Sequence, residues 1–145
     1  MTRIDFYILP DGEGGTSAPA FVISKLCEKA TRSGARVYVR VTQPAMADEI
    51  DSSLWTFNQG SFISHERHRG EPTGEPHPAV LIGDGEPPES HLGILVNLGE
   101  DVPLYFSRFD RVLEIVPATA ADRSSSRTRF KFYRDRGYEL STHNL

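Results

Sequence analysis

Cysteine is nearly absent from this sequence, which has one, Cys27, among its 145 residues. A single cysteine excludes an internal disulfide and any zinc or iron–sulfur site built from several cysteines. Long apolar runs are missing as well, since none approaches the roughly 18 residues of a membrane-spanning helix. The first apolar run is interrupted by Asp5 and is too short for a signal peptide. We therefore expect a cytoplasmic protein with no part in a membrane.

The sequence also lacks an excess of positive charge. Its 16 lysines and arginines are outnumbered by 20 aspartates and glutamates, and the formal net charge is −4. This balance argues against a protein that coats nucleic acid with its whole surface. A hydrophobic fraction of 38% and a charged fraction of 25% are typical of a folded globular protein. No repeat or linker divides the chain, so we predict a single domain over residues 1–145.

Strand-like and helix-like patterns alternate along the chain, which predicts an α/β fold. Strands are expected at 3–9, 35–41, 79–83, 93–98 and 112–116, with a short extended piece at 61–63. Most of these strands are near-continuous apolar runs, which are typical of a parallel sheet covered on both faces. We therefore predict one domain with a mostly parallel central sheet flanked by helices, a Rossmann-like three-layer sandwich.

The helices are predicted from their apolar stripes and from the residues at their ends. We expect them after Thr16 or Ser17, at 44–55 with Thr42 as the cap, and after Thr119 with Gly137 beyond the end. Two stretches rich in polar residues, proline and glycine, at 66–78 and 84–91, are predicted to be loops. We attach no function to either of them.

No pattern in the sequence supports catalysis. The glycine-rich loop at 12–17 departs from both the dinucleotide fingerprint and the P-loop, so an ordinary turn is favoured over a nucleotide site. Cys27 lies on the apolar stripe of the first helix, where a cysteine usually acts as a small core residue. His65 and His68 are flanked by arginines, which disfavours a bound cation. We therefore expect no catalytic residue, no metal and no cofactor.

The last helix carries a local excess of positive charge. Six basic residues lie within 123–136, against the single acid Asp135. Four of them recur at helical spacing and share one face: Arg123, Arg127, Lys131 and Arg134. Phe130 can flank this face. The residues allow two interpretations, a solvated helix surface or a site for an anion with an apolar part, in which arginine binds a carboxylate and the ring contacts a hydrophobic group.

A second candidate is an aromatic cluster around the end of the helix at 44–55. Trp55 and Phe57 lie close in sequence to Phe62. These side chains can complete the core, or they can form a contact patch for a partner, since tryptophan is favoured at the centres of interfaces. The residues alone favour the core.

Several segments together resemble the chi subunit of bacterial DNA polymerase III, a small accessory protein of the clamp-loader complex. They follow one another along the whole chain, at 5–9, 26–30, 34–37, 51–57, 61–65, 114–117, 127–134 and 137–140. The most specific are Glu114-Ile115-Val116-Pro117 and, further on, Arg127-Thr128-Arg129-Phe130-Lys131-Phe132-Tyr133-Arg134. No single segment is decisive, but their order and spacing are typical of that family.

The resemblance implies a non-catalytic adaptor used in DNA replication. Members of that family are joined to the clamp loader through the psi subunit, and they bind the acidic C-terminal tail of single-stranded DNA-binding protein, so that DNA is contacted indirectly. The implied fold is similar to that of nucleotide-binding domains, without nucleotide chemistry. A nucleotide-binding enzyme on the same kind of fold, or a direct binder of single-stranded DNA, remain the alternatives.

The resemblance also implies which residues meet each partner. The implied tail-binding residues are Arg127, Phe130 and Lys131, with Arg123 and Val116 as neighbours of that pocket. Trp55 and Phe62 match the aromatic positions used toward psi. One departure is that Phe130 stands where a tyrosine is common in the family, so a hydroxyl hydrogen bond to the tail would be missing.

Overall fold

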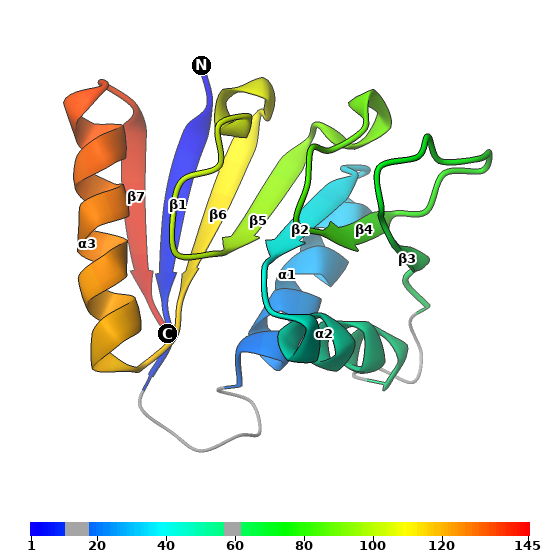
Figure 1. Cartoon of the computed structure of the whole chain (residues 1–145), viewed down its shortest axis with the longest axis horizontal. Helices are drawn as coiled ribbons and strands as arrows, with labels where there is room; N and C mark the ends of the chain where they lie inside the picture. Colours follow the sequence, from blue (N-terminus) through cyan, green and yellow to red (C-terminus); the bar gives the residue numbers. More distant parts are fainter. Residues whose placement is uncertain (11–17, 57–61) are drawn as a thin grey trace.

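The structure is a computed structural model of the chain, and it describes residues 1–10, 18–56 and 62–145. Within these residues the centre is a seven-stranded, wholly parallel sheet with the strand order β3-β4-β2-β5-β6-β1-β7 (Figure 1). The strands are β1 (Arg3–Ile8), β2 (Val37–Val41), β3 (His65–Arg67), β4 (Val80–Gly83), β5 (Ile94–Leu98), β6 (Arg111–Val116) and β7 (Glu139–Asn144). The helices are α1 (Pro19–Arg32), α2 (Pro44–Thr56), α3 (Ala120–Asp135) and the short 3₁₀ helices η2 (Glu89–His91) and η3 (Phe106–Arg108).

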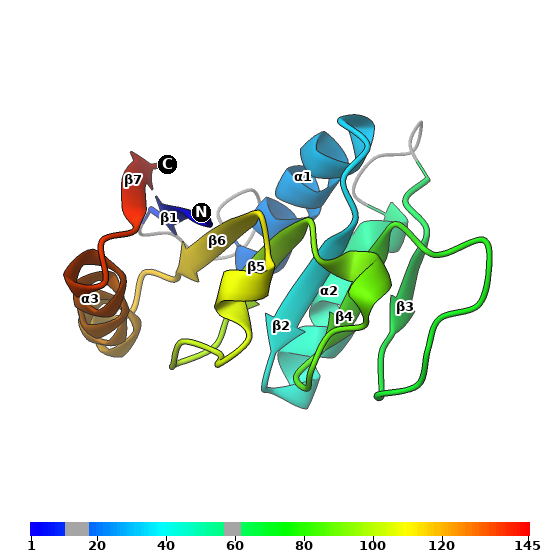
Figure 2. The same ribbon diagram turned by 90° about the horizontal axis from the view of Figure 1, so that it is seen from above.

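Helices cover the two faces of the sheet, as the apolar strands predict. Figure 2 shows α1 and α3 on opposite sides of it. Along β2 the side chains alternate: Val37 and Val39 pack in the core under α1 and α2, whereas Tyr38 belongs to the core on the side of α3. Every residue of β2 is buried. The prediction of a three-layer, Rossmann-like α/β domain is confirmed.

The first helix shows why the sequence folds locally as it does. Pro19 stands in its first turn, its apolar stripe is buried, and Gly34 follows its end at a φ of +89°, a conformation that favours glycine. Cys27 is fully buried on this stripe, and burial raises the pKa of its thiol to about 12. Cys27 is therefore a core residue, as predicted. The expected caps Thr16 and Ser17, and the loop at 12–17, lie outside the described residues.

Two edge strands differ from the prediction. The extended piece expected at 61–63 is found instead at His65–Arg67, which overlaps the start of the loop expected at 66–78, and Ser61 lies outside the described residues. Strand β7 was not predicted at all. An edge strand bonds to one neighbour through its backbone and buries few side chains, so it carries little of the apolar pattern by which strands are recognised.

A buried carboxylate ties three strands together at the β7 end of the sheet. Asp5 of β1 accepts a hydrogen bond from Arg111 Nε of β6 at 2.7 Å, and its other oxygen lies 3.0 Å from His143 Nε2 of β7. The Asp5 side chain is almost completely buried. Burial alone would raise its pKa, but the hydrogen bonds and charges of Arg111 and His143 outweigh it and hold the pKa of Asp5 below its usual value.

We expect Asp5→Asn to lower the free energy of unfolding by about 2 kcal/mol at neutral pH, because it leaves Arg111 without its buried partner. Since the folded pKa lies below the unfolded one, this contribution is present above about pH 4 and is lost as the pH falls through the folded value. Urea unfolding at about pH 7 and pH 3 measures it. The exposed Asp48, paired with Arg67, supplies the control Asp48→Asn, with little effect expected. A loss at Asp5 that did not shrink in acid would contradict this assignment.

Candidate functional site

The last helix is placed by a cap at each end. Thr119 Oγ1 accepts a hydrogen bond from the Asp122 backbone N–H at 3.1 Å and donates one to the Asp122 carboxylate at 2.6 Å. Gly137, at a φ of +80°, lets the chain turn back into β7. Both ends agree with the prediction. Helix α3 therefore lies against β1, β6 and β7, on the sheet face opposite α1 (Figures 1 and 2).

A hollow of about 240 Å³ opens between α3 and the sheet. Its floor is apolar and consists of Phe6, Ile8 and Val116, of which Val116 is fully buried. Phe130 of α3 forms a wall, and its ring centroid lies 5.3 Å from that of Phe6. Thr142 of β7 lines the outer side. The hollow is thus large enough to hold one large side chain against an apolar floor.

Two arginines line the same hollow. Arg123 is held there by a hydrogen bond from its Nη2 to the Leu9 carbonyl oxygen at 3.3 Å. Arg127, one turn further along α3, is exposed, and among the described residues it has no acidic partner. The structure therefore brings together four of the five residues that the family resemblance assigns to an acidic tail: Arg123, Arg127, Phe130 and Val116. Lys131 is exposed next to this group but does not line the hollow.

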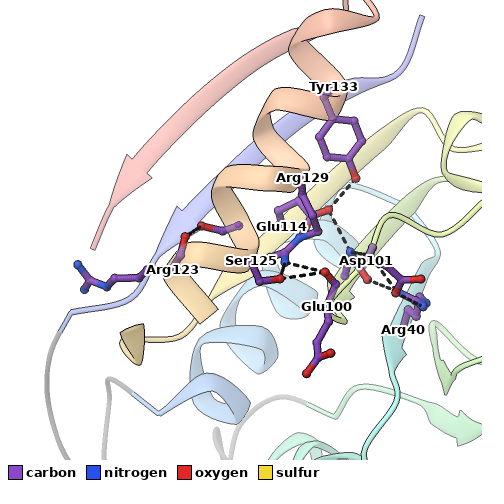
Figure 3. A network of polar contacts seen from close by, with 10 residues as sticks. Arg40, Glu100, Asp101, Glu114, Arg123, Ser125, Arg129 and Tyr133 are labelled. Carbon is purple, nitrogen blue, oxygen red and sulfur yellow. Dashed lines mark hydrogen bonds and ion pairs between the residues drawn. The ribbon is translucent and has the colours of Figure 1, made fainter. Parts of the chain in front are cut away.

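One member of the basic run does not belong to the exposed face. Arg129 is 4% exposed, and its Nε donates to Glu114 Oε1 at 2.9 Å (Figure 3). Its Nη1 also donates to Ser125 Oγ at 2.6 Å. The charge of Arg129 is thus neutralised inside the protein, and the surface of α3 is less basic than the sequence suggests. Its position, two residues after Arg127, places it on another face of the helix.

The partner of Arg129 is a fully buried carboxylate that the sequence analysis missed. Glu114 of β6 is 0% exposed, and its Oε2 accepts hydrogen bonds from Tyr133 Oη at 2.6 Å and Asn97 Nδ2 at 3.0 Å. Burial raises the pKa of Glu114, while the charge of Arg129 and the donors around it oppose that shift. A glutamate inside the apolar strand 112–116 was the available signal, because a buried charge needs a partner.

This polar network extends from Glu114 to the loop after β5 (Figure 3). Asn97 Oδ1 accepts a hydrogen bond from Arg40 Nη1 at 3.0 Å, and Arg40 Nη2 lies 2.8 Å from Asp101 Oδ1. Arg40, Asn97, Asp101 and Glu114 are therefore joined to one another by hydrogen bonds. The network therefore fixes the rotation of α3 about its axis, which directs Arg123 away from the network and toward the hollow.

The aromatic cluster is exposed. Trp55, at the end of α2, is 59% exposed and Phe62 is 73% exposed, and their ring centroids are 5.5 Å apart. The ring of His65 packs edge-on against Trp55, with the ring centroids 4.9 Å apart. The residues alone favoured a place in the core for these rings, and the structure shows a surface patch instead. Phe57 lies outside the described residues. The patch is defined here as Trp55 and Phe62.

A smaller hollow of about 170 Å³ lies where open α/β sheets often bind nucleotides, at the carboxyl ends of β2, β5 and β6. Among the described residues, Glu100 and Asp122 line it together with one arginine, Arg129, which is already bonded to Glu114. Acidic side chains around a neutralised arginine disfavour a phosphate. The geometry gives no support to a nucleotide site there.

The described residues contain no group of three or more histidine, cysteine or acidic side chains that could hold a metal. His65 Nε2 lies 2.9 Å from Asp51 Oδ1, and the ring of His68 packs edge-on against Tyr38. Among the same residues, no helix combines the length and the hydropathy that a membrane crossing requires.

Comparison with known protein families identifies a family that matches nearly the whole chain. The family described as DNA polymerase III chi subunit, HolC, matches residues 1–141. A protein named DNA polymerase III subunit chi from Pseudomonas aeruginosa is 39% identical over 145 residues, which cover 100% of this chain and 98% of that protein. Proteins of the same name from Haemophilus influenzae and Escherichia coli are 31% and 26% identical, over 97% and 98% of this chain and 95% and 97% of their own lengths.

Among solved structures, the crystal structure of T4 UvsW is similar in fold. Its TM-score is 0.64 at 11% sequence identity, and the match covers 99% of this chain and 42% of that one. At this level of identity the likeness concerns the fold alone, and it agrees with an open α/β sheet.

Proposed function

Because this chain belongs to the DNA polymerase III chi subunit family, whose members act in DNA replication, we propose that it is a cytoplasmic adaptor that joins two other replication proteins. The chi subunit is an accessory subunit of the polymerase, and membership of its family agrees with the expectation that this protein is non-catalytic. The two partners we propose are the acidic C-terminal tail of single-stranded DNA-binding protein and the psi subunit, which would connect the chain to the clamp loader.

The hollow beside α3 carries the first half of this proposal. An acidic peptide that ends in an aromatic residue presents a ring and a carboxylate close together. The apolar floor of Phe6 and Val116 suits the ring, and Arg127, with no acidic partner among the described residues, suits the carboxylate. The protein as a whole is negative, so this local pairing favours a peptide over a DNA backbone.

The patch of Trp55 and Phe62 supports the second half. Two large rings in contact with each other and largely exposed are unusual unless a partner covers them, and tryptophan anchors many interfaces. The patch lies at the end of α2, near the β3 edge of the sheet, whereas α3 lies at the β7 edge (Figure 1). We infer that psi binds at the patch, so that both partners can be bound at once.

We expect Arg127→Ala to weaken binding of the tail peptide about tenfold, near 1.5 kcal/mol, because an exposed hydrogen bond to a charged group is lost. Lys131→Ala should cost less, since lysine is a point charge outside the hollow. The measurement is calorimetric titration of each variant with the peptide.

The matched control is Arg32→Ala, which removes an exposed arginine from α1 on the opposite face of the sheet and should change nothing. Bare single-stranded oligonucleotide should not bind; tight, strongly salt-dependent binding to it would favour the direct DNA binder instead. If Arg127→Ala bound the peptide as well as Arg32→Ala did, the basic face would be solvated surface and this site would be wrong.

A further inference from the structure

The outer edge of β7 is a row of backbone groups without a strand beside it. In the described part of the chain β7 pairs with β1 alone, and it stands at the end of the sheet in Figure 2. The Leu145 N–H donates to the Ile8 carbonyl of β1 at 3.0 Å. Successive backbone groups of a strand point to opposite sides. The N–H and C=O groups of Leu140, Thr142 and Asn144 therefore point outward.

In the described part of the chain, this edge lacks several of the devices that usually prevent a strand from pairing with another chain. Proteins commonly shorten an edge strand or place proline or lysine on it. At the opposite edge of the sheet β3 has three residues, but β7 has six and contains neither proline nor lysine. A long edge without such a device is suited to accept an added strand.

The edge is continuous with the hollow beside α3. Thr142 both lines the hollow and carries outward backbone groups. Beyond the hollow, α3 runs alongside β7 (Figure 1), and its exposed face continues with Lys131 and Arg134. Arg134 is loosely paired with Asp135 at 3.5 Å. A peptide that leaves the hollow along β7 therefore passes next to two further positive charges.

We propose that the acidic tail, once its end is held in the hollow, continues as an additional parallel strand on the outer edge of β7. This inference rests on the proposed function of the hollow. The carboxylate meets Arg127 near the carboxyl end of β7, so the preceding peptide residues run back toward Glu139 and the added strand has the direction of the sheet. Every second side chain of the peptide then faces α3, where acidic groups approach Lys131 and Arg134.

The added strand has two consequences. It gives Lys131 a role in tail binding although Lys131 does not line the hollow. It also limits the paired length, because Glu139, the one acidic residue of β7, would repel an acidic peptide at the far end of the strand. We expect pairing at Thr142 and Leu140 and none beyond.

The test compares Thr142→Pro with Thr142→Ala. Proline removes the outward N–H at a position where the bond to β1 is not involved, and edge strands accept proline there; alanine removes the same side chain but keeps the N–H. Two synthetic peptides serve as probes, both ending in phenylalanine with a free carboxylate. One has about eight residues with alternating aspartates and reaches β7, and the other has about three and reaches only the hollow.

We expect the Thr142→Pro protein to bind the long peptide about tenfold more weakly than the Thr142→Ala protein does. The two variants should bind the short peptide with equal affinity. A second measurement uses the wild-type protein and so avoids any effect on folding. Long peptides are compared in which one backbone nitrogen at a time is methylated, and we expect weaker binding when the methyl group is at every second residue and unchanged binding when it is at the residues between them. Equal affinity of the two variants for the long peptide, with no alternation, would overturn the added strand. If neither peptide bound the wild type, the proposed function of the hollow itself would be wrong.

Discussion

Glu114→Gln is expected to lower the free energy of unfolding by about 3–5 kcal/mol, the largest effect of any single change considered for this protein. The substitution keeps the shape of the side chain but removes its charge, so Arg129 stays buried without a counter-ion. Tyr133 and Asn97 both donate to one oxygen of Glu114 and Arg129 donates to the other, so the new amide nitrogen faces either the first two donors or Arg129 and leaves at least one donor without this acceptor. Urea unfolding followed by circular dichroism measures the loss.

The matched control is Glu139→Gln, which neutralises an exposed glutamate and should change stability by no more than about 0.5 kcal/mol. Arg129→Met alone should also destabilise the protein, because it leaves Glu114 unpaired. The double variant Glu114→Gln/Arg129→Met should recover part of the loss, since an apolar side chain replaces the unpaired charge. A Glu114→Gln protein as stable as the Glu139→Gln protein would show that the ion pair does not hold α3 in place.

Trp55→Ala is expected to weaken the association with psi by about 2–4 kcal/mol, a loss of at least thirtyfold in affinity. Trp55 is more than half exposed and stands beside an exposed Phe62, so its removal takes contact area from a partner and little from the core. The measurement is calorimetric or surface-binding titration with purified psi.

The control for this change is the binding of the tail peptide at the other surface of the same protein. Binding of the tail peptide by Trp55→Ala should equal that of the wild type, because the hollow and the patch lie at opposite ends of the sheet. The variant should also unfold at nearly the wild-type urea concentration. Loss of both binding activities together, or a large loss of stability, would mean that Trp55 supports the fold and is no anchor for psi.

The positions of the two surfaces support the proposed adaptor role. The sheet lies between them: the patch is at the end of α2 next to β3, and the hollow is lined by residues of α3, β6, β1 and β7. Figure 1 shows that α2 and β3 are far from α3 and β7 along the sheet. Neither surface contributes a residue to the other. Changes confined to one are therefore expected to act additively with changes in the other.

Much of the geometry of the candidate site was predictable because its residues are close together in the sequence. Arg123, Arg127 and Phe130 follow helical spacing, and the caps at Thr119 and Gly137 set where that helix begins and ends. Local spacing therefore placed these side chains on one face of α3. Val116, by contrast, was assigned through the family resemblance, and the structure brings it under Phe130 through the packing of α3 on β6.

The alternation of apolar strands and amphipathic helices was determined by the sequence alone, because burial on two faces of a parallel sheet imposes a pattern within each short segment. Tertiary structure alone decided which charges reach the surface. Arg129 is buried because it forms an ion pair with Glu114, which lies fifteen residues earlier in the sequence. Segment 139–144 forms the strand β7 because it pairs with β1 along the whole length of that strand. Contacts between residues far apart in the chain leave no periodic pattern in the local sequence. They can therefore be identified only from the folded structure.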